Sequence, residues 1–106
     1  MRILTICEGG TVRSVSLARI LKDEEVDGRT HDAVAASWRW NTKETLWMLC
    51  IWADLIVVME DYMREHVSDV FHNKLKVCDV GPDRYGNWFN SELMAQCTAW
   101  AKAEGL

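Results

Sequence analysis

The stretch RILTICEGGTVRSVSLARIL, Arg2–Leu21, decides the fold. Its first six residues are mostly apolar and predict a buried strand, Arg2–Cys7. From Ser14 onward, apolar residues recur at helical spacing and predict a helix. A short loop between the two carries a cysteine, two glycines and an arginine. The stretch therefore predicts a strand, a glycine loop and a helix in direct succession.

The same alternation continues along the rest of the chain. Apolar runs bounded by polar turns predict strands, and apolar residues at helical spacing predict helices. The second helix is expected to begin at Asn41, which has Glu44 at the capping-box position. The other expected elements are a strand around Thr30–Ala35, an apolar strand at Ala53–Glu60, a polar helix at about Asp61–Val70, a strand at Lys74–Val80 and a helix at Ser91–Ala103.

Strands that alternate with helices favour an α/β fold, with a parallel sheet between two helical layers. The chain of 106 residues fits one such domain, residues 1–106. In these sheets ligands bind beyond the carboxyl ends of the strands. The first strand ends at Cys7 and the fourth ends near Pro82 and Asp83. We therefore expect both segments at the same edge of the sheet.

Composition limits the classes of function. The chain is 49% hydrophobic and 26% charged, with a formal net charge of -4, which is typical of a globular domain. An acidic chain lacks the basic surface that nucleic-acid binding needs. No apolar run is long enough to cross a membrane, and ILTIC is too short for a signal-peptide core. The expected location is the cytoplasm.

The four cysteines do not form a recognisable metal or disulfide pattern. They are Cys7, Cys50, Cys78 and Cys97, with no C-x-x-C pair and no histidine at ligand spacing, so neither a metal nor another cofactor is expected. Cys50, Cys78 and Cys97 lie on expected apolar faces and are predicted to pack in the core. The three histidines lie on polar stretches and are expected at the surface.

The loop has the pattern C-x5-R-S, with Cys7, Arg13 and Ser14 at its fixed positions. Backbone N–H groups at a helix N-terminus favour a thiolate and bind a tetrahedral anion such as phosphate or sulfate. The glycines let the chain curl tightly, and the planar guanidinium can hold two phosphoryl oxygens. The alternative is a buried Cys7 and a surface Arg13 at accidental spacing. The residues expected around the bound anion are Glu8, Gly9, Gly10, Thr11, Val12 and Ser14.

This loop resembles the phosphate-binding loop of the low-molecular-weight protein tyrosine phosphatases, in which C-x5-R-[ST] follows the first strand. WADLIVVMED, Trp52–Asp61, resembles the family's third strand and the turn after it. VGPDRYG, Val80–Gly86, resembles the segment that carries the general acid. The resemblance spans nearly the whole chain and points to a short bacterial and phage-type branch. It implies a four-stranded parallel sheet of order 2-1-3-4 in a phosphatase-type fold.

The resemblance also implies a role for each matching residue. Cys7 would be the nucleophile, Arg13 would bind phosphate and stabilise the transition state, and Ser14 would support the thiolate. Asp83 would be the general acid, and Tyr85 would wall an aromatic pocket. The implied activity is a cysteine-dependent phosphomonoesterase with a phosphocysteine intermediate. Its substrate would be a phosphotyrosine protein or a small aryl phosphate.

Several positions depart from the family pattern. Gly10 stands where the family has asparagine, Val15 and Arg84 stand where it has proline, and DAVAASW offers no clear counterpart of a supporting serine. These departures motivate a second hypothesis, a phosphate- or phosphoprotein-binding module without turnover. An arsenate reductase is disfavoured because the extra cysteines lie on regular elements. A phosphocarrier is disfavoured because its loop lacks the returning Arg13.

Three further side chains near the same edge have open roles. Asp79 competes with Asp83 as the proton donor that the leaving group needs. Trp38 and Trp40 follow the second strand, where they either line the cleft and stack on an aromatic phosphoester or anchor their loop on the core.

Overall fold

The computed structural model describes residues 1–23 and 31–106 and has an α/β architecture. Its strands form one sheet of order β2-β1-β3-β4, in which every neighbouring pair is parallel. The predicted fold class and strand order are therefore confirmed. The elements are β1 Arg2–Cys7, α1 Arg13–Asp23, β2 Asp32–Ser37, α2 Lys43–Trp52, β3 Leu55–Val58, the 3-10 helices η1 Asp61–His66 and η2 Asp69–Lys74, β4 Leu75–Val77, and α3 Ser91–Ala103.

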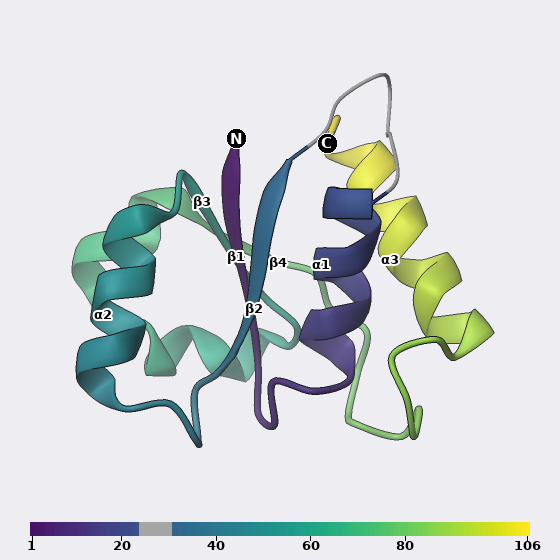
Figure 1. Ribbon diagram of the computed structural model, residues 1–106, viewed down its shortest axis with the longest axis horizontal. Helices are drawn as coiled ribbons and strands as arrows, with labels where there is room; N and C mark the ends of the chain where they lie inside the picture. Colours follow the sequence, from purple (N-terminus) through teal and green to yellow (C-terminus); the bar gives the residue numbers. More distant parts are fainter. Residues whose placement is uncertain (24–30) are drawn as a thin grey trace.

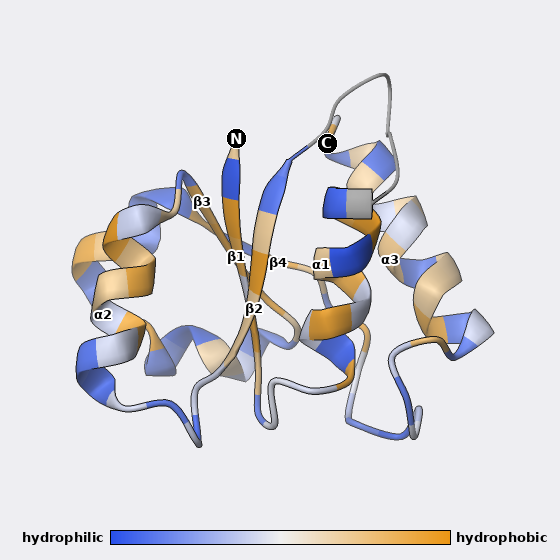
Figure 2. Ribbon diagram, viewed as in Figure 1, coloured by the Kyte–Doolittle hydropathy of each residue, from blue (hydrophilic) through white to orange (hydrophobic). Residues whose placement is uncertain are grey.

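The sheet lies between two layers of helices. Figure 1 shows α1 and α3 on one side of the strands and α2 with the two 3-10 helices on the other. The central strands are apolar along most of their length, which Figure 2 shows as orange ribbons in the middle of the molecule. All four residues of β3 are buried, as expected for a strand covered on both faces.

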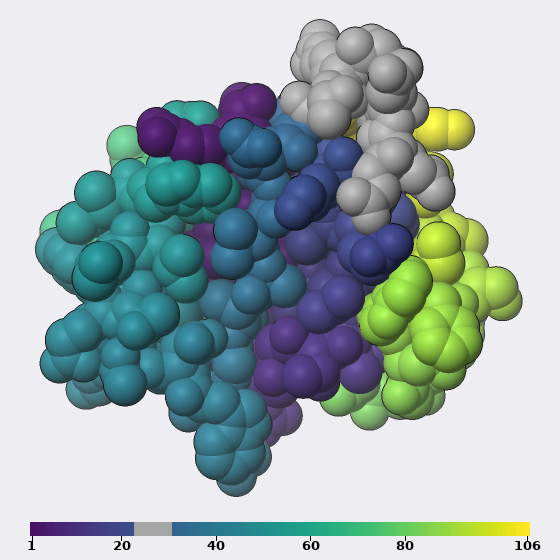
Figure 3. Space-filling view, viewed as in Figure 1, coloured from purple at the N-terminus to yellow at the C-terminus, as the bar shows by residue number. Residues whose placement is uncertain are grey.

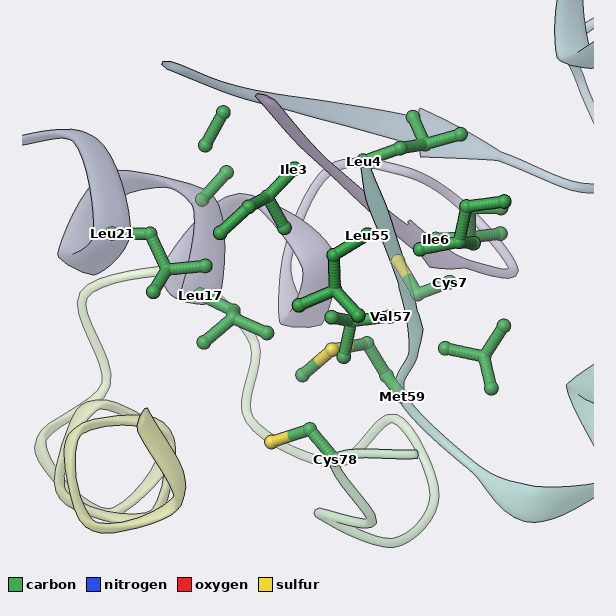
Figure 4. Packing of buried hydrophobic residues seen from close by; sticks show 14 of the residues in the cluster. Ile3, Leu4, Ile6, Cys7, Leu17, Leu21, Leu55, Val57, Met59 and Cys78 are labelled. Carbon is green, nitrogen blue, oxygen red and sulfur yellow. The ribbon is translucent and has the colours of Figure 1, made fainter. Parts of the chain in front are cut away.

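The core joins the sheet to the α1 and α3 layer. Leu17 and Leu21 of α1 are fully buried and lie beside Ile3 and Leu55 of the sheet (Figure 4). The three cysteines outside the loop have exposed fractions of 3% or less, so the prediction that they pack in the core is confirmed. Burial raises the pKa of the Cys50 thiol, which keeps that side chain uncharged.

The predicted polar helix at about Asp61–Val70 is wrong. The chain forms two short 3-10 helices instead, and Val67 and Ser68 between them are extended. A β-branched residue followed by a serine is a poor helix interior. The ring of His72 also lies 2.8 Å from the carbonyl oxygen of Val67 and 3.1 Å from that of Arg64. The His72 side chain therefore contacts backbone carbonyls that would accept backbone hydrogen bonds if the helix continued.

Two boundaries at the second strand and helix also differ from the prediction. The helix cap is Thr42, whose side chain accepts a hydrogen bond from the Thr45 N–H. Asn41 instead closes the preceding turn, because its side-chain oxygen accepts from the Ser37 N–H at 2.7 Å. The second strand runs two residues beyond the predicted Ala35, and the predicted start at Thr30 lies outside the described residues.

The expectation that all histidines lie at the surface is wrong for His31, which is 6% exposed. Its ring lies 3.2 Å from the N-terminal nitrogen of Met1 and 3.1 Å from the Leu106 carbonyl oxygen. The ring thus joins the two ends of the described chain. None of the described helices has the length and apolar character that crossing a bilayer requires.

Candidate active site

The loop between β1 and α1 closes around the sulfur of Cys7. The Gly10 N–H donates to Sγ at 3.1 Å, and the Ser14 hydroxyl lies 3.1 Å from the same sulfur. Cys7 is 2% exposed and stands at the carboxyl end of β1. A backbone N–H and a hydroxyl that converge on sulfur stabilise negative charge there. This arrangement suits a thiolate nucleophile.

Gly10 is required by both conformation and space. Its φ of 68° lies in the left-handed region, which glycine enters without steric penalty. A Cβ at this position would lie 2.9 Å from the Ser37 nitrogen and 3.0 Å from the Ala36 carbonyl carbon. The loop therefore packs directly on the end of β2. The asparagine that the family carries here would collide with this backbone.

Ser37 is the last residue of β2 and supports the loop from that side. Its hydroxyl donates to the Glu8 carbonyl and accepts from the backbone N–H groups of Arg39 at 3.1 Å and Trp40 at 2.8 Å. The expectation that the chain has no clear counterpart of a supporting serine is therefore wrong. The register of the sheet places Ser37 beside Cys7. That pairing was not visible in the sequence.

Arg13 begins α1 and is buried, with 1% of its surface exposed. Its Nη1 donates to the Glu60 carboxylate and, at 2.9 Å, to the Gly81 carbonyl oxygen. Its Nε is buried and has no hydrogen-bond partner among the described residues. The alternative of a surface Arg13 is therefore wrong. A buried N–H without a partner at an anion-binding loop is suited to an oxyanion ligand.

Glu60 is a site residue that sequence reasoning missed. It directly follows Met59 at the end of the β3 segment, and its carboxylate is the counter-charge of the buried guanidinium. The position of Glu60 in the sequence could have indicated this role, because the residue directly follows the apolar run Leu55–Met59. That run ends at the same edge of the sheet as β1. A buried arginine in the loop needs an acidic partner, and an acidic side chain at that edge of the sheet can supply it.

The two candidate proton donors have different environments. Oδ1 of Asp79 accepts from the Gly81 N–H at 3.0 Å, so this carboxylate forms a turn. Asp83 is exposed, and no hydrogen bond to its side chain is found within residues 1–23 and 31–106. Arg13 donates to the Gly81 carbonyl and so links this segment to the start of α1, next to the Cys7 loop. Asp79 is therefore engaged in a local turn, whereas the Asp83 carboxyl is open to solvent.

The Asp83 segment is anchored by its neighbours. Arg84 makes two hydrogen bonds to Glu92, of 2.8 and 2.9 Å, and these bonds hold the pKa of the Glu92 carboxyl below its usual range. Tyr85 is 4% exposed, its hydroxyl donates to the Val80 carbonyl, and the Arg84 guanidinium lies 4.5 Å from its ring centre. Such burial assigns Tyr85 an anchoring role. The role of Tyr85 as a wall of a substrate pocket stays a prediction. The burial of its side chain does not favour that role.

The two tryptophans after β2 occupy different environments. Trp40 is 71% exposed, and the β2–α2 connection that carries it projects at the lower edge of Figure 3. The Arg39 guanidinium lies 4.9 Å from its ring centre and also pairs with Glu8 of the loop at 3.0 Å. Trp38 instead stacks on His66 with ring centres 3.7 Å apart. Trp38 thus anchors the connection, whereas Trp40 is exposed with the Arg39 guanidinium over its ring.

The remaining loop residues complete the turn between Cys7 and Arg13. Glu8, Gly9 and Val12 are partly exposed, and Thr11 is exposed. In the described part of the chain no three histidine, cysteine, aspartate or glutamate side chains gather as a metal site. The structure therefore brings Cys7, Arg13 and Ser14 together, with the Asp83 segment held to the same edge through Gly81.

Comparison with known proteins identifies solved structures of similar fold, among them the following two. One is Vibrio vulnificus Wzb in complex with benzylphosphonate, with 19% identity, 96% of this chain and 97% of that chain covered, and a TM-score of 0.68. The other is the Erwinia amylovora tyrosine phosphatase AmsI, with 19% identity, 96% and 91% covered, and a TM-score of 0.66. No protein-family model and no curated protein sequence matches. The chain therefore has the α/β fold of these two structures.

Proposed function

We propose that the protein is a cysteine-dependent phosphomonoesterase that acts on aryl phosphates, including phosphotyrosine in proteins. The single observation that carries the proposal is the loop itself. The sulfur of Cys7 accepts a hydrogen bond from the Gly10 N–H, and the buried Arg13 keeps one N–H without a partner among the described residues. A thiolate next to a guanidinium N–H that can donate to an oxyanion is what phosphoryl transfer to sulfur requires.

In the first step the Cys7 thiolate attacks phosphorus in line with the leaving oxygen. The S–P bond forms, the P–O bond to the aryl group breaks, and Asp83 donates its proton to the departing oxygen. Arg13 and the loop N–H groups hold the equatorial oxygens, where negative charge is spread in the transition state. Glu60 acts as a positioning residue, because it fixes the guanidinium without touching the phosphoryl group.

In the second step water attacks phosphorus and releases inorganic phosphate. The Asp83 carboxylate takes a proton from that water, the S–P bond breaks, and the electron pair returns to Cys7 as a thiolate. The Ser14 hydroxyl, 3.1 Å from the sulfur, stabilises the departing thiolate. Each proton taken up in one step is returned in the other, so the enzyme ends in its starting state.

The mouth of the loop supports an aromatic substrate. The exposed Trp40, with Arg39 and Glu8 beside it, offers an indole face next to the anion site. An indole face favours stacking of a phenyl ring. The similar structure of Wzb holds benzylphosphonate, an aromatic phosphonate, which is consistent with this substrate class.

The proposal is tested by hydrolysis of para-nitrophenyl phosphate with the wild type and with Cys7→Ser. We expect turnover by the wild type and none above background by the variant. Equal rates would remove the nucleophile from the mechanism. Tight vanadate binding by a wild type that shows no turnover would instead favour the phosphate-binding module.

A further inference from the structure

A second concave site lies on the opposite side of the sheet from α1 and α3. It is a cavity of about 410 Å³ between α2 and the 3-10 helices η1 and η2. No described residue of the loop 7–14 or of the segment 79–85 lines it, so it is distinct from the catalytic loop. Sites for small molecules are commonly about 300–1,000 Å³. The volume is therefore sufficient for a ligand of two fused rings.

Aromatic faces form the walls of this cavity. Trp38 lines it and is stacked on His66 with an interplanar angle of 5°. Trp47 and Phe71 also line it and meet edge to face, with ring centres 4.8 Å apart. Trp47 is 47% exposed, so part of its indole is open. These walls suit a flat aromatic molecule.

The cavity exists because α2 packs loosely on the sheet. Within α2 only Cys50 is buried, although most of the helix is apolar, and Figure 2 shows much of it in orange. An apolar helix normally buries such residues against a neighbouring layer. Cys50 also lines the cavity, and burial raises the pKa of its thiol, so this part of the wall is uncharged.

The rim of the cavity carries one lysine and one glutamate. Lys43 lines the cavity at the start of α2 and has no ion pair among the described residues, and Glu65, 3.7 Å from the His66 ring, is paired only when that imidazole is protonated. Lys43 is also the first residue of α2, where the partial positive charge of the helix terminus disfavours a lysine. A contribution to helix stability therefore does not explain why a lysine stands at position 43. The lysine and the helix N-terminus together attract negative charge to one end of an aromatic cavity.

We propose that this cavity binds a flat aromatic molecule that carries one anionic group, such as a carboxylate or sulfonate. The rings lie between the Trp38 and Trp47 walls, and the anionic group pairs with Lys43. The site is independent of the phosphatase chemistry and stands whether or not the protein hydrolyses phosphate esters.

The test is an NMR titration of the full chain with 2-naphthoate, in excess inorganic phosphate so that the catalytic loop is occupied. The indole N–H signals, assigned with Trp→Phe variants, report on each tryptophan. We expect saturable shifts of Trp38 and Trp47. Trp100, whose N–H donates to the Val77 carbonyl at 3.0 Å, and Trp88, 4.4 Å from the Arg19 guanidinium, are the internal controls and should not move. Absence of a saturable shift at Trp38 and Trp47 overturns the proposal.

Charge and shape are then tested separately. The neutral 2-naphthylmethanol and the cationic 2-naphthylmethylammonium should bind more weakly than 2-naphthoate. The dissociation constant of the neutral probe should be about threefold to fivefold higher, which corresponds to the loss of one exposed ion pair. Lys43→Met should remove this difference, and Lys102→Met on the exposed face of α3 should keep it. Equal affinity of all three probes for the wild type contradicts the assignment.

Ser68→Trp provides the steric test. Ser68 is exposed, lines the cavity and makes no side-chain capping bond, so a large ring there fills the mouth without removing a contact. We expect the shifts at Trp38 and Trp47 to disappear in this variant while its melting temperature stays unchanged. Undiminished 2-naphthoate binding by a folded Ser68→Trp variant would place the ligand elsewhere and refute the site.

Discussion

Gly10→Ala should destabilise the protein more than any other single methyl added to the loop. The residue has a φ of 68°, and a Cβ there would stand 2.9 Å from the Ser37 nitrogen and 3.0 Å from the Ala36 carbonyl carbon. Neither atom belongs to a flexible side chain, because both are backbone atoms at the end of β2. The loop must therefore move away from the strand to admit the methyl group.

Two terms set the size of this effect. The left-handed conformation costs an alanine about 1–2 kcal/mol. Forcing a methyl group into a close-packed contact costs about 1–3 kcal/mol. We expect their sum, about 2–5 kcal/mol, to appear in the free energy of unfolding. For a domain of this size that lowers Tm by about 10 °C or more.

Gly9→Ala is the matched control, since a Cβ there would meet only the Thr11 Oγ1 at 3.5 Å, an ordinary contact, and Gly9 has no positive φ. Urea denaturation followed by circular dichroism measures both variants. Gly9→Ala should change the unfolding free energy by less than about 1 kcal/mol in either direction. Equal stabilities of the two alanine variants would refute the close approach of the loop to β2.

Three further outcomes follow from the site and the core. Glu60→Gln leaves the buried Arg13 guanidinium without its counter-charge and should lower the unfolding free energy by about 3 kcal/mol in urea; an unchanged value would contradict the pairing. Asp83→Asn should lower kcat for a phosphotyrosine peptide by about 100-fold or more, and an equal loss in Asp79→Asn would reassign the proton donor. Because burial raises the pKa of Cys50, its neutral form stabilises the fold below the ordinary thiol pKa of 9.0, and this contribution fades as pH rises through the raised pKa. Urea titrations below and above pH 9.0 should show this decline in the free energy of unfolding, and the decline should be smaller in Cys50→Ala. An identical decline in the variant would exclude the Cys50 thiol as its cause.

Local patterns in the sequence were sufficient for the alternation of strands and helices and for the fold class. The strand Arg2–Cys7 and the helix Ser91–Ala103 occur with the predicted bounds, because their apolar spacing is unambiguous. The central pair Cys7 and Arg13 also follows from spacing alone, since the residues that join them are contiguous. What lies on one loop between two regular elements is predictable from sequence.

Contacts between distant segments were not predictable. Ser37 supports the loop only because sheet register sets it beside Cys7, and Glu60 meets Arg13 only because β3 lies next to β1. His31 is buried because the two chain ends meet at its ring. Each of these roles depends on tertiary packing, which a single sequence does not encode in any local pattern.

The central claim is that Cys7 carries the phosphoryl group during turnover. The most direct measurement is rapid acid quenching of the protein during hydrolysis of para-nitrophenyl phosphate, followed by mass spectrometry of the peptide that contains Cys7. We predict a phosphoryl group on Cys7 in the wild type, and its absence in Cys7→Ser together with loss of turnover. Turnover by the wild type without phosphoryl on Cys7, or undiminished turnover by Cys7→Ser, would contradict the proposed mechanism.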